Sequence, residues 1–267
     1  MGVIDRRKLT QLLGLGSSTT IIAPLVTLAA LVLLWEGIAR LGVVPRYILP
    51  APSVILAYTI DNAGFLWVHA QATILATVLG FLLALAIGLF LATLMVWVRT
   101  FEAAVYPLIV ITQVIPKVAV APLLVIYMGF GLEPKIFLAF LVSFFPIVVN
   151  AVLGMKSVDR EMVELLNTLG ATQLQIFQKA RFHNAMPYIV EGSKIAIAFS
   201  IIGAIVGEFI SGSLGLGYVI NSATVSLNTV QAFSGLFLLL IIGLALFEIV
   251  AVVGNRLIPW ASARSSG

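Results

Sequence analysis

The side chains that could carry chemistry in this 267-residue chain are few. It has no cysteine and two histidines, which excludes disulfides and thiolate metal sites and leaves too few imidazoles for a histidine cluster. No G-x-x-x-x-G-K-[ST] loop is present, so ATP would have to be bound by another protein. A serine protease needs a base within reach of its nucleophile, whereas we expect His69 in an outer loop and His183 in a cytoplasmic one. These residues do not predict an enzyme.

Some ionisable side chains fall inside long apolar stretches. They are Glu36, Lys117, Glu208 and Glu248. A charge at mid-bilayer costs about 2.5–3.5 kcal/mol on insertion scales, so each needs a structural or functional reason. Glu36 precedes Arg40 by one helical turn, which favours a helix-end ion pair. Lys117, beside Pro116, could line a pathway or extend its long stem to the interface. Glu248 is interpreted as a packing residue or an interface anchor.

Glu208 has no basic residue within one helical turn, and it shares a stripe with the small or polar residues Ala196, Ser200 and Ala204. Such a stripe suits a water-accessible pathway or gate, although Glu208 could equally be a structural acceptor for another helix. A secondary transporter built on these ionisable groups is therefore an alternative function. Transport that survives removal of ATP but is lost with the proton gradient would favour it.

The elements that hold these residues are predicted to be membrane helices. Of the chain, 61% is hydrophobic and 10% charged, with a mean hydropathy of +1.15, whereas soluble domains carry about 25% charged residues. A spanning helix needs about 20 residues, and six apolar runs meet that length: 21–39, 72–98, 103–128, 136–155, 188–210 and 233–253. The sequence therefore predicts an all-α integral membrane protein with six transmembrane helices.

Six spans place both chain termini on one side of the membrane. The segments on that side hold ten of the fifteen Lys and Arg residues, so the positive-inside rule makes both termini cytoplasmic. We expect a tail over residues 1–20, a membrane domain over 21–256 and a second tail over 257–267. The proline-rich loop 41–71 is expected to be a mostly extended outer connection, with a short helix after Ser53 as the alternative.

Small residues recur every four positions along the second predicted span. They are Gly80, Ala84, Gly88 and Ala92. One face of that helix therefore lacks bulky side chains, which predicts close packing against a neighbour. The third span contains Pro107, Pro116 and Pro122, each of which removes a backbone hydrogen bond, and this favours an internal helix beside a pathway.

The segment between the fourth and fifth spans is too polar to cross a bilayer, yet it is patterned. Asp159 can cap a helix whose first turn carries Glu161. Residues at i, i+3, i+4 and i+7 give that helix one apolar face. They are Met162, Leu165, Leu166 and Leu169.

Turn signals end this helix and begin a second one. Gly170 can supply the left-handed C′ position. Thr172 followed by Gln175 fits a capping box that opens a short helix through Arg181, and Pro187 is expected to restart the membrane path. A helix pair with an exposed apolar face favours docking into a partner's groove, and a re-entrant or interface-lying hairpin is the alternative.

Glu164 and Gly170 lie in a run that resembles the EAA loop of binding-protein-dependent ABC importer permeases. That motif reads E-A-A, three residues, G, nine residues, then I-x-L-P. Leu165 and Leu166 stand in place of the two alanines, and His183 stands where the proline is usual.

Flanking sequence is similar to the sulfonate, nitrate and taurine branch of that family, in family order over residues 35–220. The matching pieces are Trp35-Glu36, the run L-P-A-P-S at 49–53, Ile115-Pro116-Lys117, Ala121-Pro122-Leu123, Phe145-Pro146, Gly207-Glu208-Phe209 and Gly215-Leu216-Gly217.

The resemblance implies a type I ABC importer permease fold in the bacterial cytoplasmic membrane. It implies a second permease copy forming a homodimer, two ATP-binding subunits, and a periplasmic or lipid-anchored solute-binding protein. No cofactor is implied for this chain, because ATP-Mg is bound by the partner ATPase. The implied solute is small and anionic or heteroaromatic, such as a sulfonate, taurine or nitrate. The alternative solutes are a thiamine-precursor pyrimidine, riboflavin or an aromatic acid.

Two sets of site residues follow from the resemblance together with the patterns above. The cytoplasmic coupling-helix loop, 156–187, is expected to contact the ATPase through Asp159, Glu161, Met162, Glu164, Leu165, Leu166, Leu169, Gly170 and Ala171. The translocation pathway or gate is expected near Pro116, Lys117, Ser200, Glu208, Gly215 and Gly217.

Overall fold

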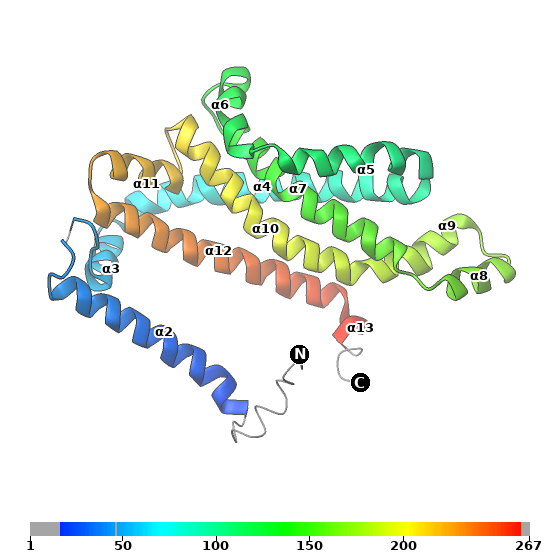
Figure 1. Cartoon of the computed structure of the whole chain (residues 1–267), viewed down its shortest axis with the longest axis horizontal. Coiled ribbons are helices and arrows are strands. Elements are labelled where there is room, and N and C mark those ends of the chain that lie inside the picture. The colour runs from blue at the N-terminus through cyan, green and yellow to red at the C-terminus, as the bar shows by residue number, and fades with distance from the viewer. Residues whose placement is uncertain (1–16, 46, 263–267) are drawn as a thin grey trace, which may run out of the picture.

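A computed structural model describes residues 17–45 and 47–262, and every regular element in these ranges is helical (Figure 1). The helices are α2 (Ser17–Arg40), α3 (Pro52–Asp61), α4 (Ala63–Trp97), α5 (Arg99–Val114), α6 (Lys117–Met128), α7 (Glu133–Lys156), α8 (Arg160–Thr168), α9 (Gln173–Ile176), the π-helix η1 (Phe177–Phe182), α10 (His183–Ser211), α11 (Leu216–Val225), α12 (Thr229–Leu257) and α13 (Pro259–Ser262). The predicted all-α class is confirmed. Most of the two predicted tails lies outside the described residues.

The predicted spans correspond to five long apolar helices and one bent pair. The long helices are Ile22–Arg40, Ala63–Trp97, Glu133–Lys156, Gln173–Ser211 and Thr229–Leu257. The third predicted span is instead α5 and α6, which meet at 97°. Pro116 causes the bend, because it lacks a donor N–H and disfavours helical backbone at Ile115, whose ψ is 122°.

The bent pair is not internal within this chain, contrary to expectation. Of residues 99–128, α5 buries Ile109 alone, and α6 buries Ala121 and Val125. The bent pair therefore contributes few side chains to the centre of this bundle.

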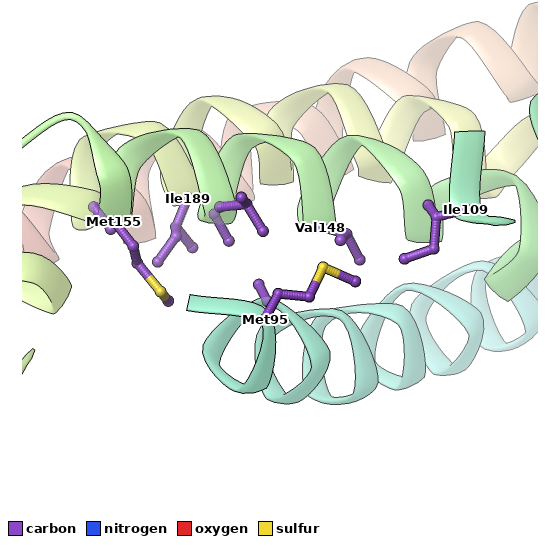
Figure 2. Close-up of a cluster of buried hydrophobic side chains, with 9 residues drawn as sticks. Met95, Ile109, Val148, Met155 and Ile189 are labelled. Carbon is purple, nitrogen blue, oxygen red and sulfur yellow. The ribbon is translucent and has the colours of Figure 1, made fainter. Parts of the chain in front are cut away.

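The core forms where α4, α7 and α10 pack together (Figure 1). The predicted small-residue face of α4 is confirmed: a Cβ on Gly80 would overlap Ala139, and one on Gly88 would overlap Ile147. Figure 2 shows one cluster of this core, where Met95 of α4 lies against Val148 of α7. Close backbone approach thus fixes these three helices as one scaffold.

The loop after α2 is more ordered than the predicted extended connection. Helix α3 and the first turns of α4 fill most of residues 41–71, which confirms the alternative of a short helix. Pro52 is the first residue of α3, a position where its missing N–H and fixed φ are tolerated. The predicted Glu36–Arg40 ion pair is present, and Glu36 also accepts from the Ser53 N–H at 3.0 Å. This contact joins the end of α2 to the start of α3.

Helix α2 diverges from the rest of the molecule (Figure 1). Its described side chains are mostly exposed, with Leu33 71% exposed. It contacts α3, and Trp35 lies against Phe233 of α12 with ring centroids 5.8 Å apart. A cavity of about 590 Å³ with an apolar lining separates α2 from α12 below this contact.

The fifth span begins earlier than predicted. A break before Pro187 was expected, but α9, η1 and α10 form one continuous helix from Gln173 to Ser211, and Pro187 lies inside it. A proline inside a helix costs roughly 3 kcal/mol, and α10 offsets this cost through its extensive packing on α7. The polar segment that follows α8 is therefore continuous with a spanning helix.

Candidate functional site

The helix pair α8 and α9 has the local structure that its turn signals predict. Gly170 is left-handed, with φ 79°. Its N–H donates to Asn167 O, and the Ala171 N–H donates to Leu166 O, each at 3.0 Å. These two bonds form the Schellman motif that ends α8. Asp159 occupies the N-cap position, but its side chain makes no capping hydrogen bond.

The second helix of the pair begins with the predicted capping box. The Gln175 N–H donates to Thr172 Oγ1 at 3.3 Å, and the Thr172 N–H donates to Gln175 Oε1 at 2.8 Å. Two donors at the helix start are thereby satisfied reciprocally. The turn between α8 and α9 is fixed by its own residues.

The apolar face of α8 is exposed. Met162 is 50%, Leu165 54% and Leu169 73% exposed, while Leu166 is half-buried. Figure 1 shows α8 projecting at one end of the molecule, beyond the bundle of long helices. The face predicted to dock is present, and nothing in the described part of the chain covers it.

Charged groups surround this apolar face. Glu164 and Arg160 form an i,i+4 pair, with 2.9 Å between Oε1 and Nε, and both side chains are mostly exposed. Asp159 and Glu161 are exposed as well. Exposed pairs contribute little to stability, so these groups can exchange one partner for another at small cost.

The base of α8 is attached to the scaffold by polar contacts. Asn184 Nδ2 donates to Gly154 O at 3.1 Å and to Ser157 Oγ at 2.9 Å. Lys156 forms an ion pair with Glu102 of α5. Helices α5, α7 and α10 are therefore joined where the chain leaves the bundle toward α8.

A second cluster of polar groups is buried at the opposite end of α10, around Glu208. Its side chain is fully buried. Oε1 accepts from Thr73 Oγ1 at 2.8 Å, and Oε2 accepts from the Gly217 N–H at 2.7 Å. Glu208 therefore links α10 to α4 and to the start of α11.

Three successive N–H groups at the start of α11 are bound by buried side chains. The Gly217 N–H donates to Glu208, as described above. The Leu216 N–H donates to Thr73 Oγ1 at 2.8 Å, and the Gly215 N–H donates to His69 Nδ1 at 3.1 Å. The first N–H groups of an α-helix have no partner within the helix, and negative charge is favourable there. Glu208, Thr73 and His69 thus anchor the N-terminus of α11, and we call them, with Lys135, the α11 anchor.

Gly215 is required at this point by its backbone and its surroundings. Its φ is 121°, which L side chains rarely adopt, and a Cβ would overlap the Glu208 carboxyl group. Lys135 Nζ donates to Leu214 O at 2.7 Å, which fixes the residue before it. The structure thus brings together Glu208, Gly215 and Gly217 of the predicted pathway set.

His69 was expected in an outer loop, and that expectation was wrong, while Lys135 was not singled out. His69 lies in α4, which begins nine residues before the predicted span, and Lys135 lies in α7. Both are buried, at 6% and 3% exposure. The i,i+4 spacing of His69 and Thr73 was the available signal, because it places both on one helix face.

Ser200 is fully buried between α10 and α4, where its Oγ donates to Thr77 O at 2.8 Å. Ala196 and Ala204 are also fully buried. The stripe on α10 is therefore a helix contact within this chain. Its predicted place in a pathway stays a prediction.

Pro116 and Lys117 lie at the bend between α5 and α6, apart from the α11 anchor. Lys117 Nζ donates to Gln113 Oε1 at 2.7 Å across the bend. Beside them is a cavity of about 260 Å³, walled by Leu138 of α7 and Ile202 of α10. One cationic group thus borders an otherwise mostly apolar space.

Comparison with known proteins places this geometry in a family. Residues 84–260 match the family described as binding-protein-dependent transport system inner membrane component. The chain is 36% identical over 231 residues to the formylaminopyrimidine transport permease protein ThiX of Halalkalibacterium halodurans, covering 86% of this chain and 92% of ThiX. It is 29% identical over 241 residues to the taurine transport system permease protein TauC of Escherichia coli, covering 88% of each.

A solved structure shares the fold. The inward-facing methionine ABC transporter MetNI contains a chain that superposes with a TM-score of 0.60 at 19% identity, over 73% of this chain and 95% of that one. The fold is that of a type I ABC importer permease. In this family ATP is hydrolysed by separate ATPase subunits, and a solute-binding protein is a further partner. The chain therefore belongs to the binding-protein-dependent inner membrane components, the multi-pass permease subunits of ABC importers.

Proposed function

We propose that this permease receives the force of ATP hydrolysis through α8, which docks in a groove of its ATPase. The observation that carries the proposal is the exposed apolar face of α8, held by a Schellman motif at one end and a capping box at the other. An amphipathic helix with a preformed end loses little conformational entropy on docking. The ATPase side of the membrane is then the side of α8, so both termini are cytoplasmic.

Because the chain has no cysteine, single cysteines can test this docking without background from the permease. Leu165→Cys and Leu169→Cys, 54% and 73% exposed, should cross-link to the ATPase in membranes. Leu33→Cys, exposed on α2, is the matched control and should not. Cross-links from Leu33 alone would contradict the docking.

The assembly we propose is two copies of this chain with two ATPase subunits and one solute-binding protein, in the bacterial cytoplasmic membrane. The bent pair α5–α6 supports a second copy, because backbone groups freed by its prolines need partners that lipid cannot supply, and α5 and α6 bury few residues within this chain. No cofactor is proposed for the permease itself, since ATP-Mg belongs to the partner ATPase. Mass measurement of the purified complex tests this composition.

The proposed solute is small and anionic or heteroaromatic. The sulfonate-type choice is supported by the likeness to TauC and by Lys117, whose ammonium group borders the cavity at the bend. The pyrimidine alternative is supported by the higher identity to ThiX. Uptake of labelled taurine against labelled formylaminopyrimidine separates the two, and Lys117→Gln should lower uptake of taurine alone, through loss of an attraction to its sulfonate group.

We place the outer gate at the α11 anchor. Glu208, Thr73 and His69 connect α10, α4 and α11, so a relative movement of these helices must break or carry along three buried hydrogen bonds. Glu208 then acts as a positioning residue for Gly215 and Gly217. Uptake driven by ATP in vesicles with the proton gradient collapsed supports the importer over an ion-coupled carrier.

A further inference from the structure

The helix Gln173–Ser211, which links α8 to the fifth span, contains a π-helical turn, called the π-turn below. Residues Phe177–Phe182 form η1, placed directly between α9 and α10. π-Helical turns are rare, and they recur at functional sites. Such a turn holds one residue more than an α-turn, so a change between the two would rotate and shift everything on one side of it.

Two aromatic contacts link the ends of this π-turn to α4 and to the short helix α13 after α12. Trp97, the last residue of α4, meets Phe177 edge-on, with ring centroids 5.5 Å apart and planes at 82°. At the other end, His183 stacks on Trp260 of α13 at 4.1 Å and 19°. The first residue of the turn is thus linked to α4, and the residue after it to the segment that follows α12.

The packing of α12 against α10 fixes the position of the segment that carries Trp260. Shortly before it, a Cβ on Gly254 would overlap Val190, so α12 lies directly against α10 there. Ile258 is 7% exposed, which secures the end of α12. Trp260 therefore reaches His183 from a segment attached to the scaffold.

Helix α8 itself does not support the π-turn. A cavity of about 720 Å³ separates them, with Met162 and Leu166 of α8 on one side and Lys179 and His183 on the other. A displacement of α8 can therefore reach α10 along the chain, through α9 and η1, in addition to the contact of Ser157 with Asn184 at the base of α8. A π-turn free to change register would absorb that displacement.

We propose that Trp97 and Trp260 are positioning residues that hold η1 in register, so that movement of α8 is passed to α10. The proposal rests on the docking of α8 described above. It assigns to His183, where the related loop has a proline, the role of a stacking partner. The two tryptophans act only through η1 and have no contact with solute or ATP in this role.

The test is the number of solute molecules transported per ATP hydrolysed by the reconstituted complex. Trp260→Ala and His183→Ala should each lower this ratio roughly two- to tenfold, the range expected from losing one aromatic pair. Trp260→Phe should retain most of the ratio, because a phenyl ring can still stack. Trp67→Ala, at a side chain 57% exposed on α4, is the matched control.

Cross-linking through Leu165→Cys is measured in the same variants. A lowered ratio with unchanged cross-linking supports the proposal. An unchanged ratio in both Trp260→Ala and Trp97→Ala, with cross-linking retained, overturns it and leaves the docking intact. Absence of the cross-link in the complex without these substitutions overturns the docking and, with it, this inference.

Discussion

The two ends of α10 use polar residues in opposite ways. At the end near α11, Glu208 is fully buried, and each of its oxygens has a partner within the chain. At the end near α8, Glu164 and its neighbours are exposed beside an apolar face that the described chain does not cover. The polar groups of the α11 anchor are thus satisfied within one chain, whereas the apolar face of α8 is left for the proposed partner. Substitutions at the α11 anchor should therefore change stability, and those on α8 should change coupling.

The largest loss of stability is expected for Glu208→Ala. Its removal leaves Thr73 and the Gly217 N–H without their buried acceptor. Each such donor costs about 1–3 kcal/mol, so the free energy of unfolding should fall by roughly 2–6 kcal/mol. Thermal unfolding in detergent measures this. Glu208→Gln, which keeps an acceptor oxygen, should lose less, and equal losses for both variants would contradict the hydrogen-bond account.

The second largest loss of stability is expected for Gly215→Ala. The new Cβ would meet the Glu208 carboxyl group while the backbone stays at φ 121°, and a strained backbone of this kind costs about 1–3 kcal/mol. Gly212→Ala is the matched control, because the nearest atom to its Cβ would lie 3.9 Å away. If both variants unfold at the same temperature, α11 is not held as described.

The sequence predicts the structure around α8 better than the α11 anchor, because the contacts of the two regions differ in sequence separation. The α8 ending at Gly170 and the box at Thr172 and Gln175 are made by neighbours in the chain, so their residue types suffice to predict them. The α11 anchor instead joins residues such as Thr73 and Glu208, which are 135 positions apart. No periodic pattern in the sequence indicates that these two residues are in contact. For the same reason the stripe that includes Ser200 was interpreted as a possible pathway, although it packs on α4.

The bend at Pro116 is another feature that the sequence does not predict. The sequence predicts three broken hydrogen bonds in the third span, but it does not say which proline turns the chain. Pro107 and Pro122 stay inside helices, whereas Pro116 separates two of them by 97°. That choice depends on how α6 packs against α7, which is a tertiary contact.

On the α8 side, Gly170→Val should cost less stability than either substitution at the α11 anchor and should affect coupling more. The position is left-handed, so a β-branched residue is strained there, but no atom lies within 4 Å of the new Cβ. We expect the helix pair to change its angle while membrane insertion is unaffected. Solute-stimulated ATPase activity of the purified complex should fall, and activity equal to that of the unchanged chain would refute the docking assignment.

The smallest effect on stability is expected for Glu164→Lys. Its side chain is 63% exposed and its one ion pair, with Arg160, is an exposed pair of the kind that stabilises little. The unfolding temperature of the isolated permease should therefore stay unchanged. Its charge, however, reverses beside the apolar face that docks, and a like charge next to Arg160 disfavours the present arrangement of α8. Loss of ATPase stimulation without loss of stability would place the function of this glutamate in the partner contact. Arg160→Ala removes the same ion pair without reversing the charge of Glu164, so it should leave stimulation nearly unchanged, and equal loss in both variants would instead assign the effect to the pair itself.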